Sequence, residues 1–384
     1  MDNKKNGIPK LRFPGFNGAW EQRKFSEILA KSDGLRRGPF GSALKKEFFI
    51  SSSEYTVYEQ NNAIYNTWKT RYFITPEKFQ ELHKFQLVPG DFILSGAGTI
   101  GRIAQVPANI TKGVFNQALI RIRINPEWMD KKFFLIWMQS ENMQRKLTQA
   151  NPGSAMTNLV PMSEIKKWEI IIPSKAEQNK IGEFIQKLNS LIALHQRKLN
   201  KLKKLKSAYL TEMFPDEGEH KPKRRFAGFT DDWEQRKLGE ITKTHSFKQY
   251  ISEAFDHGKY MVIQQGENPI AGYANGDPFE NFKDVTLFGD HTLSLFKPQE
   301  KFFVASDGIK ILSPSLKMNG MFYYYLLEKY RPQSEGYKRH FTIMKKSTAL
   351  FPIEIDEQIK ISNFLEELDS LIALHQRKPN TLFS

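Results

Sequence analysis

The chain has 384 residues, 40% of them hydrophobic, and a formal net charge of +15. This length allows two or three domains, and the basic excess points to a polyanionic partner, with nucleic acid favoured over a membrane. Cysteine is absent, which excludes disulfides, thiolate metal sites and a cysteine nucleophile and suits a reducing cytoplasm. The longest apolar run, residues 133–138, is too short to span a bilayer, and the N-terminus lacks the apolar stretch of a signal peptide. We therefore expect a cytoplasmic protein.

Two motifs occur twice and divide the chain. An opening motif, Trp-Glu-Gln-Arg-Lys, stands at 20–24 and again at 233–237, each time shortly after a Pro-Lys-x-Arg-Phe-x-Gly-Phe stretch. A helix motif, Ser-Leu-Ile-Ala-Leu-His-Gln-Arg-Lys, stands at 190–198 and returns letter for letter at 370–378. The segments between opening and helix motifs share no such identity. This pattern indicates a tandem duplication with divergent middles.

The divergent middles both mix short apolar runs with turn signals. In the first, we predict strands at 55–58, 91–94, 100–106, 118–124 and 168–172, with a helix over 128–147. In the second, we predict strands near 260–263, 292–296 and 301–305, with a helix near 320–330. Each middle is expected to be a compact α+β domain.

The helix motif belongs to a long amphipathic stretch. From about 178 to 213, apolar residues fall at steps of three and four, and a helix of that length extends roughly 50 Å at 1.5 Å per residue. The second copy starts the same seam but has Pro379 where the first has Leu199, and an interior proline costs a helix about 3 kcal/mol. We therefore expect two long, antiparallel, coiled-coil-like helices, the second shortened. The predicted packing sets Ile185, Leu188 and Ile192 against their counterparts Leu365, Leu368 and Ile372.

Polar residues of the helix motif recur as faithfully as the apolar ones. Because packing constrains only the apolar seam, identical exposed residues indicate one partner surface that docks twice; a recent duplication without drift is the alternative. The candidate partner-binding residues are His195, Gln196, Arg197, Lys198, His375, Gln376, Arg377 and Lys378. The lysine run over 198–206 is interpreted as a solvated helix face, with contact to a DNA backbone as the alternative.

The sequence Gly-Ala-Gly-Thr-Ile-Gly at 96–101 matches a dinucleotide-binding fingerprint but lacks its context. No helix follows it, and Arg121 stands where an acidic ribose ligand is expected. We interpret it as a glycine-rich strand–turn–strand loop. Such a loop can bring backbone amides, Thr99 or Arg102 against a phosphate or a base edge.

Other catalytic signals are incomplete. Asp277-Pro-Phe has one proline too few for the loop that presents carbonyl acceptors to a flipped adenine, and Glu164-Ile-Lys166 has no nearby acidic partner for a nuclease metal. The eight histidines show no paired metal-ligand spacing, and there is no P-loop. The chain itself is therefore not expected to carry out chemistry.

Signals for binding are stronger. Tyr-Lys-Arg-His-Phe at 337–341 combines cationic donors with aromatic rings, and the polar run at 153–158 lies at a similar distance before the first helix. Solvated loops are the alternative for both. Candidate DNA contacts in the first middle are Ser95, Thr99, Arg102, Asn116, Gln117, Ser154, Thr157 and Asn158. Those in the second are His291, Lys310, Tyr337, Lys338, Arg339 and His340.

Along nearly its whole length, the chain resembles the specificity subunit of bacterial type I restriction-modification systems. The resemblance rests on the two opening motifs, the stretch 95–104 with its Gly-Thr-Ile-Gly turn, Phe-Asn-Gln-Ala-Leu at 115–119, and the similar stretches 171–181 and 351–361 before each helix. It implies an α+β fold with an internal pseudo-two-fold repeat. The implied parts are an N-terminal repeat (1–28), target-recognition domain 1 (29–175), a central helix (176–213), a linker with the second opening motif (214–241), target-recognition domain 2 (242–355) and a shortened C-terminal helix (356–384).

The resemblance also implies partners. Each domain would read one half of a bipartite, asymmetric site on double-stranded DNA. Two methyltransferase subunits would dock on the helices and carry S-adenosylmethionine and adenine-N6 chemistry, while restriction motor-nuclease subunits would use ATP and Mg. This chain would hold no catalytic residue, cofactor or metal. Two other classes stay open: an enzyme that itself methylates or cuts DNA, and a coiled-coil scaffold whose middles bind protein.

Overall fold

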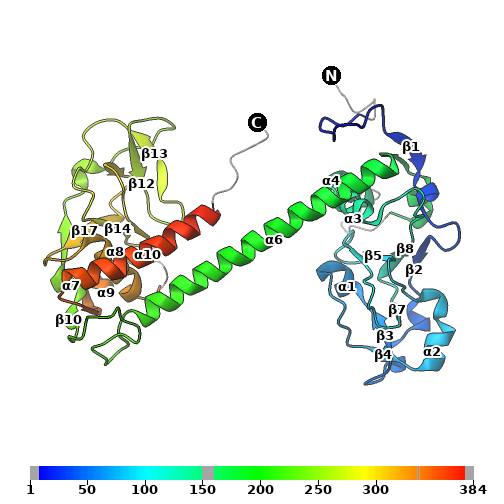
Figure 1. The fold of residues 1–384 in the computed structure, drawn as a ribbon, viewed down its shortest axis with the longest axis horizontal. Coiled ribbons are helices and arrows are strands. Elements are labelled where there is room, and N and C mark those ends of the chain that lie inside the picture. The colour runs from blue at the N-terminus through cyan, green and yellow to red at the C-terminus, as the bar shows by residue number, and fades with distance from the viewer. Residues whose placement is uncertain (1–7, 149–159, 335, 337, 377–384) are drawn as a thin grey trace. The chain divides into compact units, whose positions relative to one another are not determined.

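The computed structural model describes residues 8–148, 160–334, 336 and 338–376 (Figure 1). It divides into two compact units, Met1–Ile192 and Ala193–Ser384. The boundary falls within one long helix, α6 (Lys175–Glu212), so each unit includes part of it.

The first unit is built on two small sheets. The four-stranded sheet has the order β2 (Leu35–Arg37), β8 (Leu119–Ile122), β5 (Phe92–Ser95), β6 (Ile103–Gln105), with every neighbour antiparallel. In the three-stranded sheet, β3 (Tyr55–Tyr58) lies between antiparallel β4 (Phe73–Ile74) and parallel β7 (Gly113–Phe115). The helices are α1 (Gln60–Tyr65), α2 (Pro76–Glu81), α3 (Lys131–Gln139), α4 (Glu141–Thr148) and α5 (Met162–Lys167).

The second unit repeats this topology with different residues. Its four-stranded sheet has the order β11 (Thr242–His245), β17 (Ile309–Pro314), β14 (Thr286–Gly289), β15 (Leu295–Phe296), again antiparallel throughout. Its three-stranded sheet places β12 (Tyr260–Ile263) between antiparallel β13 (Ile270–Ala274) and parallel β16 (Phe302–Val304). The helices are α7 (Leu238–Ile241), α8 (Gly320–Tyr330), α9 (Phe341–Lys346) and α10 (Ile355–Gln376). The two middles therefore share one fold.

The repeated motifs close each unit. The first opening motif forms β1 (Glu21–Lys24), which pairs antiparallel with β9 (Glu169–Ile172); the second forms β10 (Glu234–Lys237), which pairs with β18 (Thr348–Phe351). The strand before each middle is thus hydrogen-bonded to the strand after it. This pairing returns the chain to the start of the long helices.

A buried ion pair recurs at the same joint in both units. In the first, Arg12 donates from Nε to Glu177 Oε1 at 2.8 Å. In the second, Arg225 donates from Nε to Glu357 Oε1 at 2.7 Å. Both carboxylates are buried, and a buried charge is stable only when it is paired. The repeated arginine and glutamate therefore have a structural role in each unit, as partners in a buried ion pair.

The glutamine next to each buried glutamate is also structural. Gln178 donates from Nε2 to the Pro173 carbonyl at 2.9 Å and accepts from the Asp130 amide at 2.8 Å. Gln358 makes the two equivalent bonds in the second unit, at 2.7 and 2.9 Å. Each buried side-chain amide thereby connects the end of a strand to the start of a helix, α3 or α8.

Sequence predictions of individual elements are mostly confirmed. The strands at 55–58 and 260–263 and the helix at 320–330 are present with the predicted bounds. The helix predicted over 128–147 is two helices, α3 and α4, because Ser140 is extended and its hydroxyl accepts from the Met143 amide at 3.4 Å. The strand predicted over 292–296 shortens to β15, since Leu293 has φ +58 in a turn.

The predicted pairing of equivalent helix positions is wrong. Leu188 and Ile192 are 38% and 65% exposed, whereas Leu368 and Ile372 are buried within the second unit. The apolar face of α10 packs instead in one core with Tyr209 and Leu210 at the C-terminal end of α6 and with Met213 just after it. An antiparallel, two-fold-related pair brings equivalent residues together only at its axis, so most contacts join non-equivalent positions.

Candidate nucleic-acid interface

The predicted contact residues of the first unit that the structure describes lie on or beside two loops at one edge of the four-stranded sheet. One loop follows β5 and the other precedes β8, and these strands are antiparallel neighbours. The Gly96 amide donates to the Ala118 carbonyl at 2.7 Å and joins the loops. The glycine-rich sequence at 96–101 connects β5 to antiparallel β6, so the predicted strand–turn–strand loop is confirmed.

Side chains in the glycine-rich loop divide into two groups. Ser95 is buried, and its hydroxyl donates to the Thr99 carbonyl at 2.6 Å and accepts from the Arg102 amide at 2.9 Å. Ser95 therefore shapes the loop, in correction of its prediction as a DNA contact. Gln60 of α1 supports the loop by donating to the carbonyls of Ala97 and Thr99. The side chains of Thr99 and Arg102 are exposed.

A third segment, residues 36–41, joins these loops and was not found by sequence reasoning. The Gly38 amide donates to the Leu119 carbonyl at 3.0 Å, and Arg37 Nε donates to the Gln117 carbonyl at 3.2 Å. A Cβ at Gly38 would lie 1.9 Å from the Asn116 carbonyl oxygen, so only glycine permits this approach. The sequence signal was the basic pair before a Gly-Pro turn.

Segment 36–41 lies between two surface hollows. The larger, of about 1000 Å³, is lined by four cationic side chains, Lys31, Arg36, Arg37 and Lys166, together with Gln117. The smaller, of about 290 Å³, is lined by Gln117 as well, with residues that include Asn116, Lys46 and Arg71. Cations at this density suit backbone phosphates, and a side-chain amide at the border suits a base edge.

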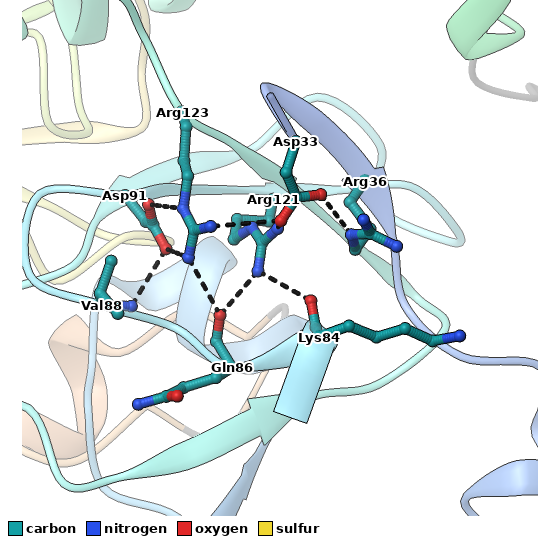
Figure 2. A network of polar contacts seen from close by, with 8 residues as sticks. All are labelled: Asp33, Arg36, Lys84, Gln86, Val88, Asp91, Arg121 and Arg123. Atoms are coloured by element: carbon teal, nitrogen blue, oxygen red, sulfur yellow. Dashed lines mark hydrogen bonds and ion pairs between the residues drawn. The ribbon is translucent and has the colours of Figure 1, made fainter. Parts of the chain in front are cut away.

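A buried network of arginines and aspartates supports the larger hollow (Figure 2). The Asp33 carboxylate accepts hydrogen bonds from Arg36, Arg121 and Arg123. Arg121 is only 1% exposed, and burial, followed by the nearby charge of Arg123, lowers its pKa. Arginine nevertheless stays charged in proteins. The network therefore fixes the positions of three charged guanidinium groups, and that of Arg36 lines the larger hollow.

Further hydrogen bonds extend the network (Figure 2). Asp91 accepts from Arg123 Nε at 2.7 Å and from the Val88 amide at 3.0 Å. Arg121 also donates to the Gln86 carbonyl at 2.7 Å. The network therefore connects the turn before β2 to β8 and to the chain before β5.

Among its described residues, the second unit has no equivalent of this network. In the matching register, Arg121 of β8 faces Ile93, whereas Ile311 of β17 faces Leu287. An apolar residue thus stands in the second unit where the first has a buried arginine. The two units offer different chemistry on one framework.

Candidate residues of the second unit also gather at the corresponding sheet edge. The Asp290 amide after β14 donates to the Gly308 carbonyl before β17 at 2.8 Å. The His291 amide donates to Gln265 Oε1 at 3.2 Å. Lys310 Nζ donates to the Asp307 carbonyl at 2.8 Å, so its charge is held close to the same loops.

The segment before α9 docks on these loops. His340 is buried, its amide donates to the Asp290 carbonyl at 2.8 Å, and its Nδ1 lies 3.1 Å from the same oxygen. His340 thus anchors the segment, which corrects its prediction as a base reader. Lys338 and Arg339 are exposed beside it. Ser154, Thr157, Asn158 and Tyr337 lie outside the described residues.

The candidate partner-binding residues of α6 are all exposed: His195, Gln196, Arg197 and Lys198. In α10, His375 is half-buried and Gln376 exposed, while Arg377 and Lys378 lie outside the described residues. The rings of His195 and His375 are 6.0 Å apart, so the two copies meet here.

One lysine of the run 198–206 departs from the predicted solvated face. Lys206 lies 2.9 Å from Glu328 and 2.8 Å from Asp369 and is mostly buried. It joins α6 to α8 and α10. The other lysines of the run are exposed.

Two general properties of the described residues bear on function. None of their helices combines the length and apolar character needed to cross a membrane. Within the same part of the chain, no three His, Asp or Glu side chains gather in a way that could hold a metal ion.

Comparisons with solved structures agree with this fold. A type I restriction-modification S subunit from M. genitalium matches with a TM-score of 0.62 at 17% identity, covering 97% of this chain and 94% of that one. A chain from work on complex assembly and conformational transition of the type I R-M system matches at 0.50 and 15% identity, covering 95% and 93%. HsdS from Thermoanaerobacter tengcongensis matches at 0.45 and 16%, covering 97% and 94%.

Sequence comparison identifies the family. A search of curated proteins gave no match. The family model described as Type I restriction modification DNA specificity domain matches twice, at residues 18–204 and 230–383. These two matches take in both sheets of each unit and most of both long helices, so the chain belongs to the family of type I restriction-modification DNA specificity domains and is a DNA-recognition subunit.

Proposed function

We propose that the chain reads a bipartite, asymmetric site on double-stranded DNA, with one half of the site read by each unit. The observation that carries this proposal is the shared strand order of the two units combined with different side chains on the corresponding loops. A common framework presents each set of loops in the same way, and different side chains then select different bases. Two identical readers would instead select a symmetric site.

In the first unit, positively charged side chains position the DNA and amides read it. Arg36, Arg37 and Lys166 around the larger hollow would contact phosphates, which fix register but carry no sequence information. Gln117 lines both hollows and Asn116 lines the smaller one, and side-chain amides pair in a bidentate manner with adenine in the major groove. Thr99 and Arg102, exposed on the adjoining loop, extend the same surface.

In the second unit, the exposed Lys338 and Arg339 would take the phosphate-contacting role. His291 lies on the loop that follows β14, and Lys310 is the second residue of β17. The described candidates here are His291, Lys310, Lys338 and Arg339, whereas those of the first unit include the side-chain amides of Asn116 and Gln117. We therefore expect the second half-site to differ in sequence from the first.

The repeated polar helix surface would bind a partner. Docking of two methyltransferase subunits is supported by the exposed residues His195, Gln196, Arg197 and Lys198 of the first helix motif. The same four residue types recur in the second motif, from His375 onward. Those subunits would supply S-adenosylmethionine and adenine-N6 chemistry, and restriction motor-nuclease subunits would supply ATP- and Mg-dependent cleavage. The family to which this chain belongs serves recognition, so we place no catalytic step on this chain.

Methylome sequencing of cells with and without this chain tests the proposal. We expect loss of one adenine-methylated motif made of two fixed blocks separated by a spacer. Loss of a single contiguous motif, or of none, would overturn it. The enzyme alternative gains support if the purified chain alone transfers methyl groups from S-adenosylmethionine to DNA.

A salt series separates DNA reading from a purely protein-binding scaffold. With phosphate contacts, the logarithm of DNA affinity of the assembled subunits falls linearly with the logarithm of salt concentration, with a slope near −0.9 per phosphate neutralised. A scaffold predicts weak affinity that does not vary with salt.

A further inference from the structure

The first unit carries an open copy of a helix-docking groove that is filled in the second unit. The open face consists of Phe184, Leu188 and Ile192, at steps of four along α6, so they form one stripe. All three are exposed: 48%, 38% and 65%. A stripe of three large apolar side chains on a helix otherwise rich in charge is typical of a docking surface.

The sequence repeat identifies the covered copy of this face. The helix motif aligns Phe184, Leu188 and Ile192 with Phe364, Leu368 and Ile372 of α10. Leu368 and Ile372 are only 6% and 8% exposed, and Phe364 is half-buried. The same residue types at equivalent positions are therefore buried in one unit and exposed in the other.

The cover in the second unit is the C-terminal part of α6, from residue 199 to 212, together with Met213 directly after it. The ring of Tyr209 packs edge-on against Phe364 with centroids 4.7 Å apart. Lys206 Nζ lies 2.8 Å from Asp369, and Met213 belongs to the same core as Leu368. The covering segment thus contributes an apolar stripe of Tyr209, Leu210 and Met213, with Lys206 beside it.

The other wall of the groove is present in both units. In the first, Phe13 packs edge-on against Phe184 at 5.5 Å; in the second, Phe226 packs against Phe364 at 6.3 Å. The two phenylalanines Phe13 and Phe226 are equivalent in the opening repeat. What the described part of the first unit lacks, relative to the second, is the covering helix.

The sequence agrees with this asymmetry. The second helix copy has Pro379 where the first has Leu199, the residue that begins the cover. Proline in a helix interior removes a hydrogen bond and clashes with the preceding turn. A cover made in the same way from the second copy is therefore disfavoured.

We propose that the open face binds an amphipathic helix supplied by another polypeptide, with a tyrosine–leucine–methionine stripe like that of residues 199–213. Its docking is mainly apolar, because Asn189 stands where the second unit has Asp369, the partner of Lys206. The proposal concerns a face distinct from the DNA-reading loops and does not depend on the proposed function. Its failure would leave DNA reading untouched.

The test uses the full chain and a fluorescently labelled peptide of residues 198–214. Anisotropy titration should show saturable binding of one peptide per chain, with little dependence on salt. Leu188→Asp with Ile192→Asp should weaken binding by at least about tenfold, equivalent to about 1.4 kcal/mol. Because both residues are exposed, the variant should keep its thermal unfolding midpoint. A peptide with Tyr209→Ser and Met213→Ser should bind equally poorly.

A variant that is expected to tighten binding excludes the possibility that the other substitutions weaken binding only by unfolding the chain. Asn189→Asp restores the carboxylate that pairs with Lys206 in the second unit, so it should tighten peptide binding and make it salt-sensitive. Lys187→Asp, on the same helix but off the stripe, is the control for added negative charge. Absence of saturable binding, or binding that survives Leu188→Asp with Ile192→Asp, overturns the proposal.

Sedimentation of the chain alone completes the test. We expect a mass that does not change with Leu188→Asp. A dimer that this substitution dissociates would mean that a second copy of the chain occupies the face, which overturns the assignment to another polypeptide.

Discussion

Removing the Asp33 carboxylate should destabilise the first unit without changing its backbone. Asp33 has φ +62, a left-handed conformation that asparagine tolerates, so Asp33→Asn isolates the charge. The substitution leaves the buried Arg121 guanidinium without its ionic partner, although bonds to the Lys84 and Gln86 carbonyls stay. It also releases Arg36, which lines the larger hollow.

The expected magnitude follows from burial. Removing one partner of a buried ion pair costs about 3–5 kcal/mol. The Asp33 side chain is 24% exposed, so water replaces part of the lost interaction. We therefore expect a loss of about 2–3 kcal/mol, at or below the lower bound of that range.

Hydrogen exchange in the full chain measures this loss locally. Amides of β2 and β8 should exchange about 30- to 150-fold faster in Asp33→Asn, since each tenfold corresponds to about 1.4 kcal/mol. Amides of β14 and β17, in the second unit, are the internal control and should not change. With Arg121→Met in the background, Asp33→Asn should cost at least about 1 kcal/mol less. Exchange in β2 and β8 within about twofold of the parent would refute the reasoning.

Three further predictions concern reading, folding and pH. Gln117→Ala should relax selectivity at one position of one half-site by about 1–3 kcal/mol. Arg37→Ala should instead weaken binding to all DNA sequences and reduce the slope of log affinity against log salt concentration by about 1. Selection from a randomised DNA pool at several salt concentrations distinguishes the two effects. Glu357→Ala leaves the mostly buried Arg225 unpaired and should lower the second unit's stability by about 3 kcal/mol in urea unfolding, whereas the exposed Glu217→Ala should be near neutral. Burial lowers the pKa of Lys297 to about 8 from 10.5, so the unfolded chain binds the extra proton between these values and stability should rise with pH across that window. Lys297→Met should abolish that part of the rise, and an unchanged pH profile would count against the assignment.

The repeated parts of the fold were predictable from sequence because the duplication marks them. The opening motifs and the stretches before each helix recur, and the structure pairs them as β1 with β9 and β10 with β18. The apolar spacing of the long helix was equally clear. The predicted helix from about 178 to 213 agrees with α6 to within three residues at either end.

The strand order that the two middles share was not visible from sequence. Their sheets share one strand order, yet the matching positions hold residues as different as Arg121 and Ile311. Strand order is set by long-range pairing, which a single sequence does not reveal when neither letters nor spacing recur. Short strands such as β2 and β7 also lack the length to give a periodic signal.

The candidate site was predicted only in outline. The structure brings the loops that carry Gln117 and Arg102 together at one edge of the first unit's four-stranded sheet, and the loop of His291 lies at the corresponding edge in the second unit. Burial then removes Ser95 and His340, which serve to shape loops. Polar residue type alone does not distinguish a side chain that faces solvent from one that satisfies a buried backbone group. The segment 36–41 was missed because its role comes from the close approach of Gly38 to Asn116.

Exchange of residues 242–355 for the corresponding domain of another member of the family tests the central claim most directly. Methylome sequencing of cells that carry the exchanged chain should show a motif in which one half-site and its spacing are kept and the other half-site is new. A motif in which both halves change, or in which neither does, would contradict the account of two independent readers on one framework.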